Sequence, residues 1–269
     1  MNEAFHIVRP QGRRLPVVVS CPHSGTEIPP ELAAAMDPEL ARAVPDTDWF
    51  VHELYSFAPE LGITVIHARY SRFVIDLNRD PEGKKLYADG RAETSLVPVT
   101  TFGLARLYRG AEPDETEIAR RRRTYYDPYH QQVAALVQEL KGEFPHVLLY
   151  EAHSIKRLVT SIRKDPFPDL MLGDQKGRTA DARLTGVALE ELRRSGEWTV
   201  QHNDPFMGGY LTRRFGQPHT GVHALQLEMS QDVYMDEDRA ARDPAKQEKM
   251  QVTLRRTLAE LARTVEGLR

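Results

Sequence analysis

The chain has 269 residues, of which 41% are hydrophobic and 28% charged, a composition typical of one globular α/β unit. Its formal net charge of −3 gives no basis for nucleic acid or an anionic membrane surface as a partner. The single cysteine, Cys21, excludes an intramolecular disulfide and any multi-cysteine metal site. A bound metal would therefore need histidine and carboxylate ligands.

Residues 1–20 contain neither the long apolar run of a membrane segment nor the cleavage pattern of a signal peptide. Together with the lone cysteine, this predicts a soluble, cytoplasmic protein. The chain also contains no low-complexity tract, internal repeat or linker-like stretch. We therefore expect residues 1–269 to form a single catalytic domain.

Short apolar runs predict buried strands, and amphipathic segments between them predict helices. In chain order, we expect a strand at 15–20, a helix at 48–59, strands at 64–67 and 73–77, a helix at 115–141 with a kink at Pro128, a strand at 147–150, a helix at 179–194, a strand at 222–229 and a helix at 244–268. Two stretches rich in proline and glycine, at 80–113 and 157–177, predict long surface excursions that could cover a site.

This alternation of strands and helices favours an α/β fold, a three-layer sandwich with a mixed, largely parallel central sheet. Ligands of such sheets bind at the carboxyl ends of the strands. Several polar residues stand at or just after the end of a predicted strand, namely His23, Asn78-Arg79, His153 and Glu228. Two histidines, a carboxylate and an Asn/Arg pair are the ingredients of a catalytic zinc site for an anionic substrate.

Each of these residues also has a simpler interpretation. A single histidine at a strand end is more often structural than a metal ligand, and only the pairing of His23 with His153 strengthens the metal hypothesis. Asp48, taken alone, is more often a helix N-cap. Glu228 is either a strand-terminal acid in solvent or a general base beside the metal. Arg72, like the Asn/Arg pair, is either a polar strand-edge residue or part of a carboxylate-binding site.

The chain closely resembles the N-formylglutamate amidohydrolase family over nearly its whole length. The motifs that carry the resemblance are Pro22-His23-Ser24-Gly25, Pro45-Asp46-Thr47-Asp48-Trp49, residues 70–79, Ala152-His153-Ser154-Ile155, residues 208–213, Leu225-Gln226-Leu227-Glu228 and Tyr234-Met235. The family is similar in turn to zinc carboxypeptidases and aspartoacylase-type deacylases, which implies a phosphorylase/hydrolase-like fold. It also implies zinc-dependent hydrolysis of N-formyl-L-glutamate to L-glutamate and formate, a reaction of histidine degradation.

The resemblance implies that His23 and His153 are zinc ligands and that the segment 45–48 supplies a carboxylate ligand. Asp48 is favoured for this role, with Asp46 as the alternative. The chain departs from the carboxypeptidase pattern His-x-x-Glu, because Glu27 stands one residue too late after His23. Iron, cobalt or manganese would also suit two histidines and a carboxylate, so zinc follows from the family resemblance.

For catalysis, the resemblance implies Glu228 as the general base and Arg72 as the group that polarises the scissile carbonyl. The small anionic substrate carries two carboxylates, so two cationic groups are expected to bind it. Asn78-Arg79 would bind the first carboxylate. Arg213, which follows Gly208-Gly209, is the candidate for the second, although the glycine pair is equally well explained as a simple turn.

Three other functions compete with this interpretation. The first is a metal-dependent amidohydrolase of the same fold that acts on another N-acyl amino acid or on a peptidoglycan amide. The second is a non-catalytic relative that binds an anion, which would have no need of a base beside a metal. The third is a cysteine hydrolase using Cys21 and His23, but adjacent residues at a strand end point apart.

Overall fold

The computed structural model describes residues 4–86 and 93–269, so residues 1–3, and residues 87–92 of the predicted excursion at 80–113, lie outside the description. Within the described ranges, seven strands form one sheet in the order β1-β3-β2-β4-β7-β5-β6. These strands are β1 (Phe5–Val8), β2 (Val17–Cys21), β3 (Thr64–Ala68), β4 (Val147–Ile155), β5 (Leu170–Gly173), β6 (Val200–His202) and β7 (Val222–Ser230). A small ribbon is formed by β8 (Met235–Asp236) and β9 (Ala241–Arg242).

The sheet is mixed, and its central strands are parallel. β3, β2, β4 and β7 run parallel to one another, as do β5 and β6, whereas β1 pairs with β3 and β5 pairs with β7 in the antiparallel sense. Every residue of β4 and β7 is buried. Both faces of a parallel sheet are covered, which explains why these strands read as apolar runs rather than as alternating patterns. The predicted mixed, largely parallel sheet is confirmed.

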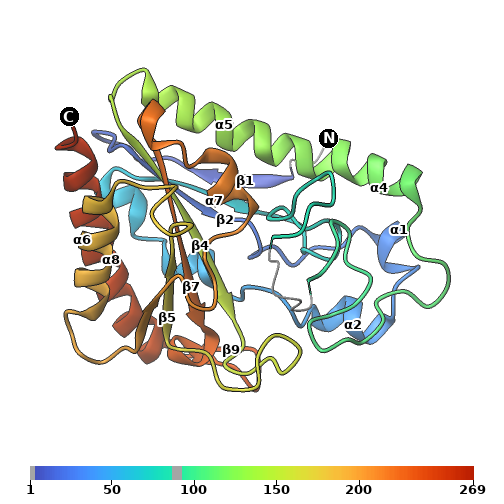
Figure 1. Ribbon diagram of the computed structural model, residues 1–269. Coiled ribbons are helices and arrows are strands. Elements are labelled where there is room, and N and C mark those ends of the chain that lie inside the picture. The colour runs from blue at the N-terminus through green and yellow to red at the C-terminus, as the bar shows by residue number, and fades with distance from the viewer. Residues whose placement is uncertain (1–3, 87–92) are drawn as a thin grey trace.

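Helices cover both faces of the sheet and complete a three-layer α/β sandwich (Figure 1). α6 (Ala182–Arg193) and α8 (Pro244–Glu266) pack on one face, and α5 (Asp127–Lys141) crosses the other. Successive side chains of β2 point to opposite faces of the sheet. Val17 and Val19 pack in the core under α8, and Val18 packs in the core under α5. The predicted three-layer architecture is therefore correct.

The remaining helical elements are short or continue a longer helix. They are α1 (Pro30–Ala33), α2 (Pro38–Ala43), α3 (Val51–Leu54), η1 (Ala58–Leu61), α4 (Glu115–Arg121), η2 (Arg122–Tyr126), α7 (Tyr210–Phe215), η3 (Pro218–Thr220) and η4 (Gln231–Val233). η2 is a π-helical turn between α4 and α5, and it stands just before Pro128, the predicted kink. None of the helices in the described ranges combines the length and apolarity needed to span a membrane.

The predicted helix at 48–59 is wrong. The structure has only α3 and η1 in this range, and Phe50 stands at the start of α3 in the left-handed conformation, with φ of 61°. A left-handed residue interrupts the right-handed helix, so the helix cannot extend back to Asp48. Asp48 is consequently not the N-cap of α3, and its side chain is available for other partners.

The predicted strand at 73–77 is also wrong. Residues 71–79 form consecutive turns, in which the Ser71 hydroxyl and the Asp76 carboxylate accept hydrogen bonds from the amides of Phe73 and Asn78. Such side-chain bonds compete with the ladder of a sheet. The run is apolar because its side chains are buried in the cores, and periodicity alone cannot distinguish a short buried turn from a buried strand.

Several short elements were not predicted, among them β1, β5, β6 and α7. β5 lies inside the stretch at 157–177 that we expected to be a surface excursion. These elements have only three to six residues each, too few for a recognisable period. Their position in the sheet follows from pairing with strands far away in the sequence, as for β5 with β7.

Two aromatic residues near the start of α5 hold the turn that carries Asn78 and Arg79. His130 Nε2 lies 2.9 Å from the carbonyl oxygen of Leu77, and the Tyr126 hydroxyl donates to the carbonyl oxygen of Arg79 at 2.8 Å. The two rings stack with centroids 4.0 Å apart. Because Arg214 contacts Nδ1 at 3.1 Å, His130 accepts there and donates from Nε2, which requires the neutral ring.

We expect His130 to make the protein sensitive to acid. Burial lowers the pKa of His130 to about 3, so the unfolded chain binds more protons than the folded one between about pH 6.5 and pH 3. The stabilisation is complete above that range and is lost as the pH falls. In urea unfolding from pH 7 to 4.5, the stability advantage of the wild type over His130→Gln should shrink by at most about 1.4 kcal/mol per pH unit.

The exposed His219 offers a control for this prediction. His219→Gln makes the same substitution at an exposed position, and the pH dependence of His130→Gln is compared with it. A constant difference between the wild type and His130→Gln over the same range would show that His130 does not couple stability to pH.

Candidate active site

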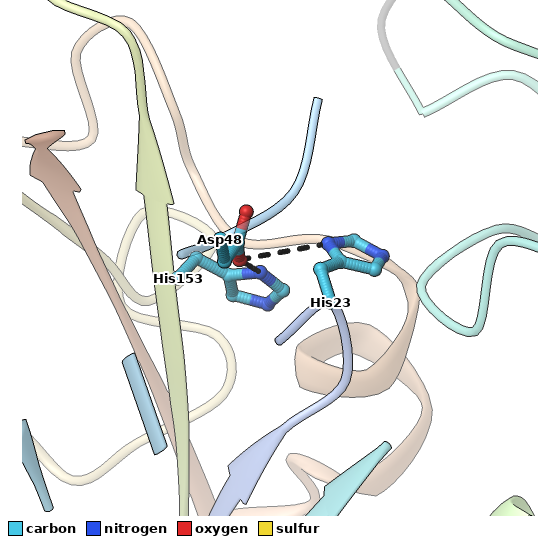
Figure 2. A group of neighbouring side chains, drawn as sticks. All are labelled: His23, Asp48 and His153. Carbon is cyan, nitrogen blue, oxygen red and sulfur yellow. Dashed lines mark hydrogen bonds and ion pairs between the residues drawn. The ribbon is translucent and has the colours of Figure 1, made fainter. Parts of the chain in front are cut away.

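Three predicted ligand side chains converge at the carboxyl ends of the central strands. His23 follows β2, His153 lies near the end of β4, and Asp48 lies in the loop before α3 (Figure 2). β2 and β4 are parallel neighbours, so their ends meet at one edge of the sheet. The three side chains are buried, and one potential ligand atom from each lies within 4.8 Å of the others. The structure thus brings together residues that are far apart in the sequence.

The ring nitrogens of both histidines face the same carboxylate oxygen. Asp48 Oδ2 lies 3.1 Å from His153 Nδ1 and 3.8 Å from His23 Nδ1, as the dashed lines in Figure 2 show. Zinc binds imidazole nitrogens and carboxylate oxygens at about 2.0–2.2 Å, so its ligand atoms stand roughly 3–4 Å apart. Two Nδ1 atoms and one carboxylate oxygen at these separations form a donor set that suits a divalent cation.

The far nitrogen of each histidine faces a second, fully buried carboxylate. His23 Nε2 lies 2.7 Å from Asp76 Oδ1, and His153 Nε2 lies 3.7 Å from Glu151 Oε2. A histidine that binds metal through one nitrogen carries its proton on the other and needs an acceptor there. Asn78 Nδ2 is closer to His153 Nε2, at 3.1 Å, but its amide oxygen already accepts from the backbone of Leu211. The NH₂ group of Asn78 can only donate to His153 Nε2, and Glu151 Oε2, at 3.7 Å, lies beyond hydrogen-bond distance. Neither Glu151 oxygen has a hydrogen-bond partner among the described residues, so a small shift would let Glu151 accept the Nε2 proton of a metal-bound His153.

The sequence interpretation did not single out either Asp76 or Glu151. Glu151 stands two residues before His153 on the same strand, so the two side chains share one face of the sheet. That spacing is a signal that could have identified Glu151. Asp76 offered no such signal, because its partner His23 comes from a different part of the chain.

Electrostatics keep His23 neutral and Asp76 ionised. Burial, reinforced by the Arg72 guanidinium, lowers the pKa of His23 to about 4. Burial alone would raise the pKa of Asp76, but Arg72 and His23 hold it well below its usual range. Arg72 Nη2 donates to Asp76 Oδ2 at 2.5 Å. A neutral His23 whose Nε2 is held by Asp76 leaves Nδ1 free to bind a metal.

His153 shows the opposite shift. Burial would lower the pKa of His153, but its interactions with Asp48 and Glu151 raise it to about 10. Both rings lie between two carboxylates, and His23 differs because the Arg72 guanidinium beside it also lowers its pKa. The negative charge around His153 therefore favours a proton on its ring. A divalent ion bound at this site would displace that proton.

Glu228 lies beside this cluster on the neighbouring strand. In the parallel pairing of β4 and β7 it stands in register with His153, and its carboxylate lines the same cavity. Burial raises the pKa of Glu228 to about 8, although the attraction of His153 opposes this rise. A buried carboxylate of this kind can take up and release a proton near neutral pH. The solvent-exposed alternative for Glu228 is wrong, since the residue is only 8% exposed.

The cavity at these residues has a volume of about 70 Å³. Eight of the predicted site residues line it: His23, Asp48, Arg72, Asn78, Arg79, His153, Gly209 and Glu228. Three others do not line the part of it that the described residues form. Asp46 Oδ2 accepts from the amide of Phe102, Arg213 donates to the carbonyl oxygen of Leu86, and the carbonyl oxygen of Gly208 accepts from Gln175.

Cys21 is fully buried in the core under α8. Burial raises the pKa of its thiol well above the ordinary value. A neutral, buried thiol is a poor nucleophile, which argues against the cysteine hydrolase alternative.

Comparisons with known proteins identify the family of the chain. A sequence model of the N-formylglutamate amidohydrolase family matches residues 15–235. The chain belongs to this family.

Two curated relatives are each named N-formylglutamate deformylase. The protein from Pseudomonas aeruginosa is 42% identical over 226 residues, which cover 83% of this chain and 84% of the relative. The protein from Pseudomonas putida is 38% identical over 239 residues, or 87% of this chain and 85% of the relative. A crystal structure of N-formylglutamate amidohydrolase from Ralstonia eutropha JMP134 superimposes with a TM-score of 0.81 at 28% identity, covering 98% of this chain and 99% of that one. The family resemblance drawn from the motifs is confirmed.

Within this family site, Gly209 allows a close approach between two segments. Its amide donates to Gln226 Oε1 at 2.7 Å, and a Cβ atom at this position would lie 2.3 Å from Asn78 Nδ2. Gly208 has a φ of 105°, which favours glycine. The glycine pair lies in an irregular segment directly before α7, and Gly209 leaves room for the Asn78 side chain in the cavity wall.

We expect Gly209→Ala to displace Asn78, because the added methyl group and the amide cannot occupy the same space. KM for the substrate should rise about tenfold or more, since a hydrogen bond to a charged group contributes about 1.5–3 kcal/mol. Steady-state kinetics would measure this change. Gly110→Ala is the matched control, because its Cβ would meet nothing within 4 Å. An unchanged KM in Gly209→Ala would show that Asn78 does not depend on this contact.

Proposed function

We propose that the chain is a metal-dependent amidohydrolase that converts N-formyl-L-glutamate and water to L-glutamate and formate. The observation that carries the proposal is the convergence of His23, Asp48 and His153 beside Glu228, in a buried cavity that also contains Arg72. The names of the Pseudomonas relatives support the same substrate. The proposal includes that this reaction is a step of histidine degradation and takes place in the cytoplasm.

The donor set fits zinc, and a carboxylate lies behind each histidine ligand, as is usual for metal-binding histidines. His23 and His153 would bind the ion through Nδ1, and Asp48 through Oδ2. Another divalent transition metal would also suit these ligands. When bound, the ion would act as a Lewis acid that polarises the formyl carbonyl and makes water a better nucleophile.

Glu228 would accept a proton from the attacking water as the new C–O bond forms at the formyl carbon. It would then donate that proton to the nitrogen as the C–N bond breaks and the glutamate amine departs. Arg72 would stabilise the negative charge that develops on the formyl oxygen, a type of interaction that contributes several kcal/mol. Asp76 holds the Arg72 guanidinium in place, so this cation is preorganised before the substrate arrives.

Asn78 and Arg79 would bind one substrate carboxylate, since both line the cavity next to Gly209. Arg213 remains the candidate for the second carboxylate. Its guanidinium contacts the carbonyl oxygen of Leu86, and Leu86 itself lines the cavity. A modest movement of this side chain would bring a second cation to the substrate.

The test of the proposed function is formate release from N-formyl-L-glutamate by the purified protein, before and after chelation and zinc restoration. We expect release that stops with the chelator and returns with the metal. Protein that binds metal but releases no formate would refute the substrate, and a panel of other N-acyl amino acids would then replace it. Formate release that persists after complete metal removal would refute metal dependence.

We expect Arg79→Ala to raise KM about 10- to 100-fold with little change in bound metal. The reason is the loss of a charge-assisted hydrogen bond of about 1.5–3 kcal/mol to the substrate carboxylate. Initial rates over a range of substrate concentrations, together with metal analysis, would measure both quantities. Arg239→Ala is the control, because the Arg239 side chain is 82% exposed. Unchanged kinetics in Arg79→Ala would remove Arg79 from the substrate site.

A further inference from the structure

A second, much larger cavity lies directly outside the catalytic one. It has a volume of about 550 Å³, compared with about 70 Å³ for the catalytic cavity. Leu40, Leu104, Leu158 and Val159 give it a largely apolar lining. Three residues, Phe102, Ser154 and Ile155, line both cavities. The two spaces are thus neighbours that share a wall, and the largest side chain in this wall is the Phe102 ring.

The backbone of Phe102 is held independently of its ring. Its amide donates to Asp46 Oδ2 at 2.7 Å, and its carbonyl oxygen accepts from Ser161 Oγ at 2.5 Å. The ring itself packs on the guanidinium of Arg72, with Cζ 4.6 Å from the ring centroid. Because two hydrogen bonds hold the loop, shortening the side chain should open the wall without releasing the loop.

The order of contacts shows which end of a substrate would face Phe102. The Phe102 ring contacts Arg72, Arg72 donates to Asp76 Oδ2 at 2.5 Å, and Arg79 Nε lies 3.9 Å from the same oxygen. Arg72 therefore contacts both the Phe102 ring and the carboxylate that Arg79 approaches. With the scissile carbonyl at Arg72, the acyl substituent would lie next to the Phe102 ring that packs on this guanidinium.

We propose that Phe102 restricts the acyl group of the substrate to formyl, an inference that rests on the proposed function. The ring closes the catalytic cavity at the point where the carbon chain of a longer acyl group would extend. Without the ring, the catalytic cavity would open into the outer one and accept acetyl or propanoyl groups. The reaction remains amide hydrolysis: water adds to the acyl carbon, the C–N bond breaks, and a longer carboxylate leaves in place of formate.

The experiment compares kcat/KM for N-formyl-, N-acetyl- and N-propanoyl-L-glutamate in the wild type, Phe102→Ala and Phe102→Leu. We expect the acetyl-to-formyl ratio to rise about tenfold or more in Phe102→Ala, because one carbon in a tight pocket alters discrimination by at least that factor. Phe102→Leu should show a smaller rise. Leu104→Ala is the control, since Leu104 lines only the outer cavity, and its ratio should equal that of the wild type.

Binding to chelated protein provides a readout that does not depend on turnover. Calorimetry should show a smaller difference in Kd between N-acetyl- and N-formyl-L-glutamate in Phe102→Ala than in the wild type, even if the variant is inactive. Unchanged ratios in both measurements would overturn the inference. The inference would also be overturned if Phe102→Ala changed the preference among N-formyl amino acids with different side chains but left the acyl preference unchanged. A wild type that releases no formate would refute the proposed function itself, and this inference with it.

Discussion

Replacing Glu228 with glutamine is expected to lower kcat by about 10²–10⁴-fold, the range that general acid–base catalysis contributes. Glutamine has nearly the shape of glutamate but cannot accept the proton of the attacking water. Bound metal and KM should remain close to their wild-type values, because Glu228 lies outside the group of His23, Asp48 and His153. Formate release at saturating substrate and metal analysis of the same preparation would measure both effects.

Glu248→Gln is a matched control on the exposed face of α8, and it should behave as the wild type. Near-normal turnover in Glu228→Gln would refute its role as the base. A loss of bound metal together with activity would instead show that Glu228 acts by holding the ion.

Asp48→Asn is expected to abolish metal binding at neutral pH and formate release with it. The substitution preserves the volume of the side chain but removes the negative charge between the two Nδ1 atoms. Removing a residue that hydrogen-bonds to a metal ligand lowers metal affinity by about 10–100-fold. Removing the charge of a ligand itself should therefore lower metal affinity by about 100-fold or more. Competition with a chelator of known affinity would measure the change.

Asp46→Asn is the informative comparison, because Asp46 was the alternative carboxylate ligand. Its Oδ2 accepts from the amide of Phe102, and an asparagine oxygen can accept the same bond. We therefore expect Asp46→Asn to bind metal with wild-type affinity. The opposite result, with metal lost in Asp46→Asn and kept in Asp48→Asn, would transfer the ligand role to Asp46.

Long elements with a clear pattern were predictable from the sequence. α8 was predicted to within two residues, and β4 and β7 were recognised as buried apolar runs. Applied to β2 and β4, the rule that ligands gather at carboxyl ends placed His23 and His153 at one edge of the sheet. The prediction succeeded because parallel neighbours necessarily end on the same side.

The sequence-based predictions were wrong where one local sequence pattern is compatible with two different structures. Residues 73–77 have the composition of a strand. However, the side chains of Ser71 and Asp76 accept hydrogen bonds from backbone amides two residues further on and hold the backbone in turns. Asp48 has the position of an N-cap, but the left-handed Phe50 begins the helix later and frees its carboxylate. In both cases the local pattern admits two structures, and hydrogen bonds or backbone conformation within two residues select one.

By itself, the sequence determined the fold class, the family and most of the residues that line the candidate site, because local patterns and motifs carry that information. Only the tertiary structure decided which of those residues contact one another. Asp76 meets His23 across 53 positions of the chain, and Phe102 reaches Asp46 across 56. Such contacts depend on how the sheet and its loops pack together. A carboxylate behind a histidine, or a ring in a cavity wall, therefore becomes visible only in the folded chain.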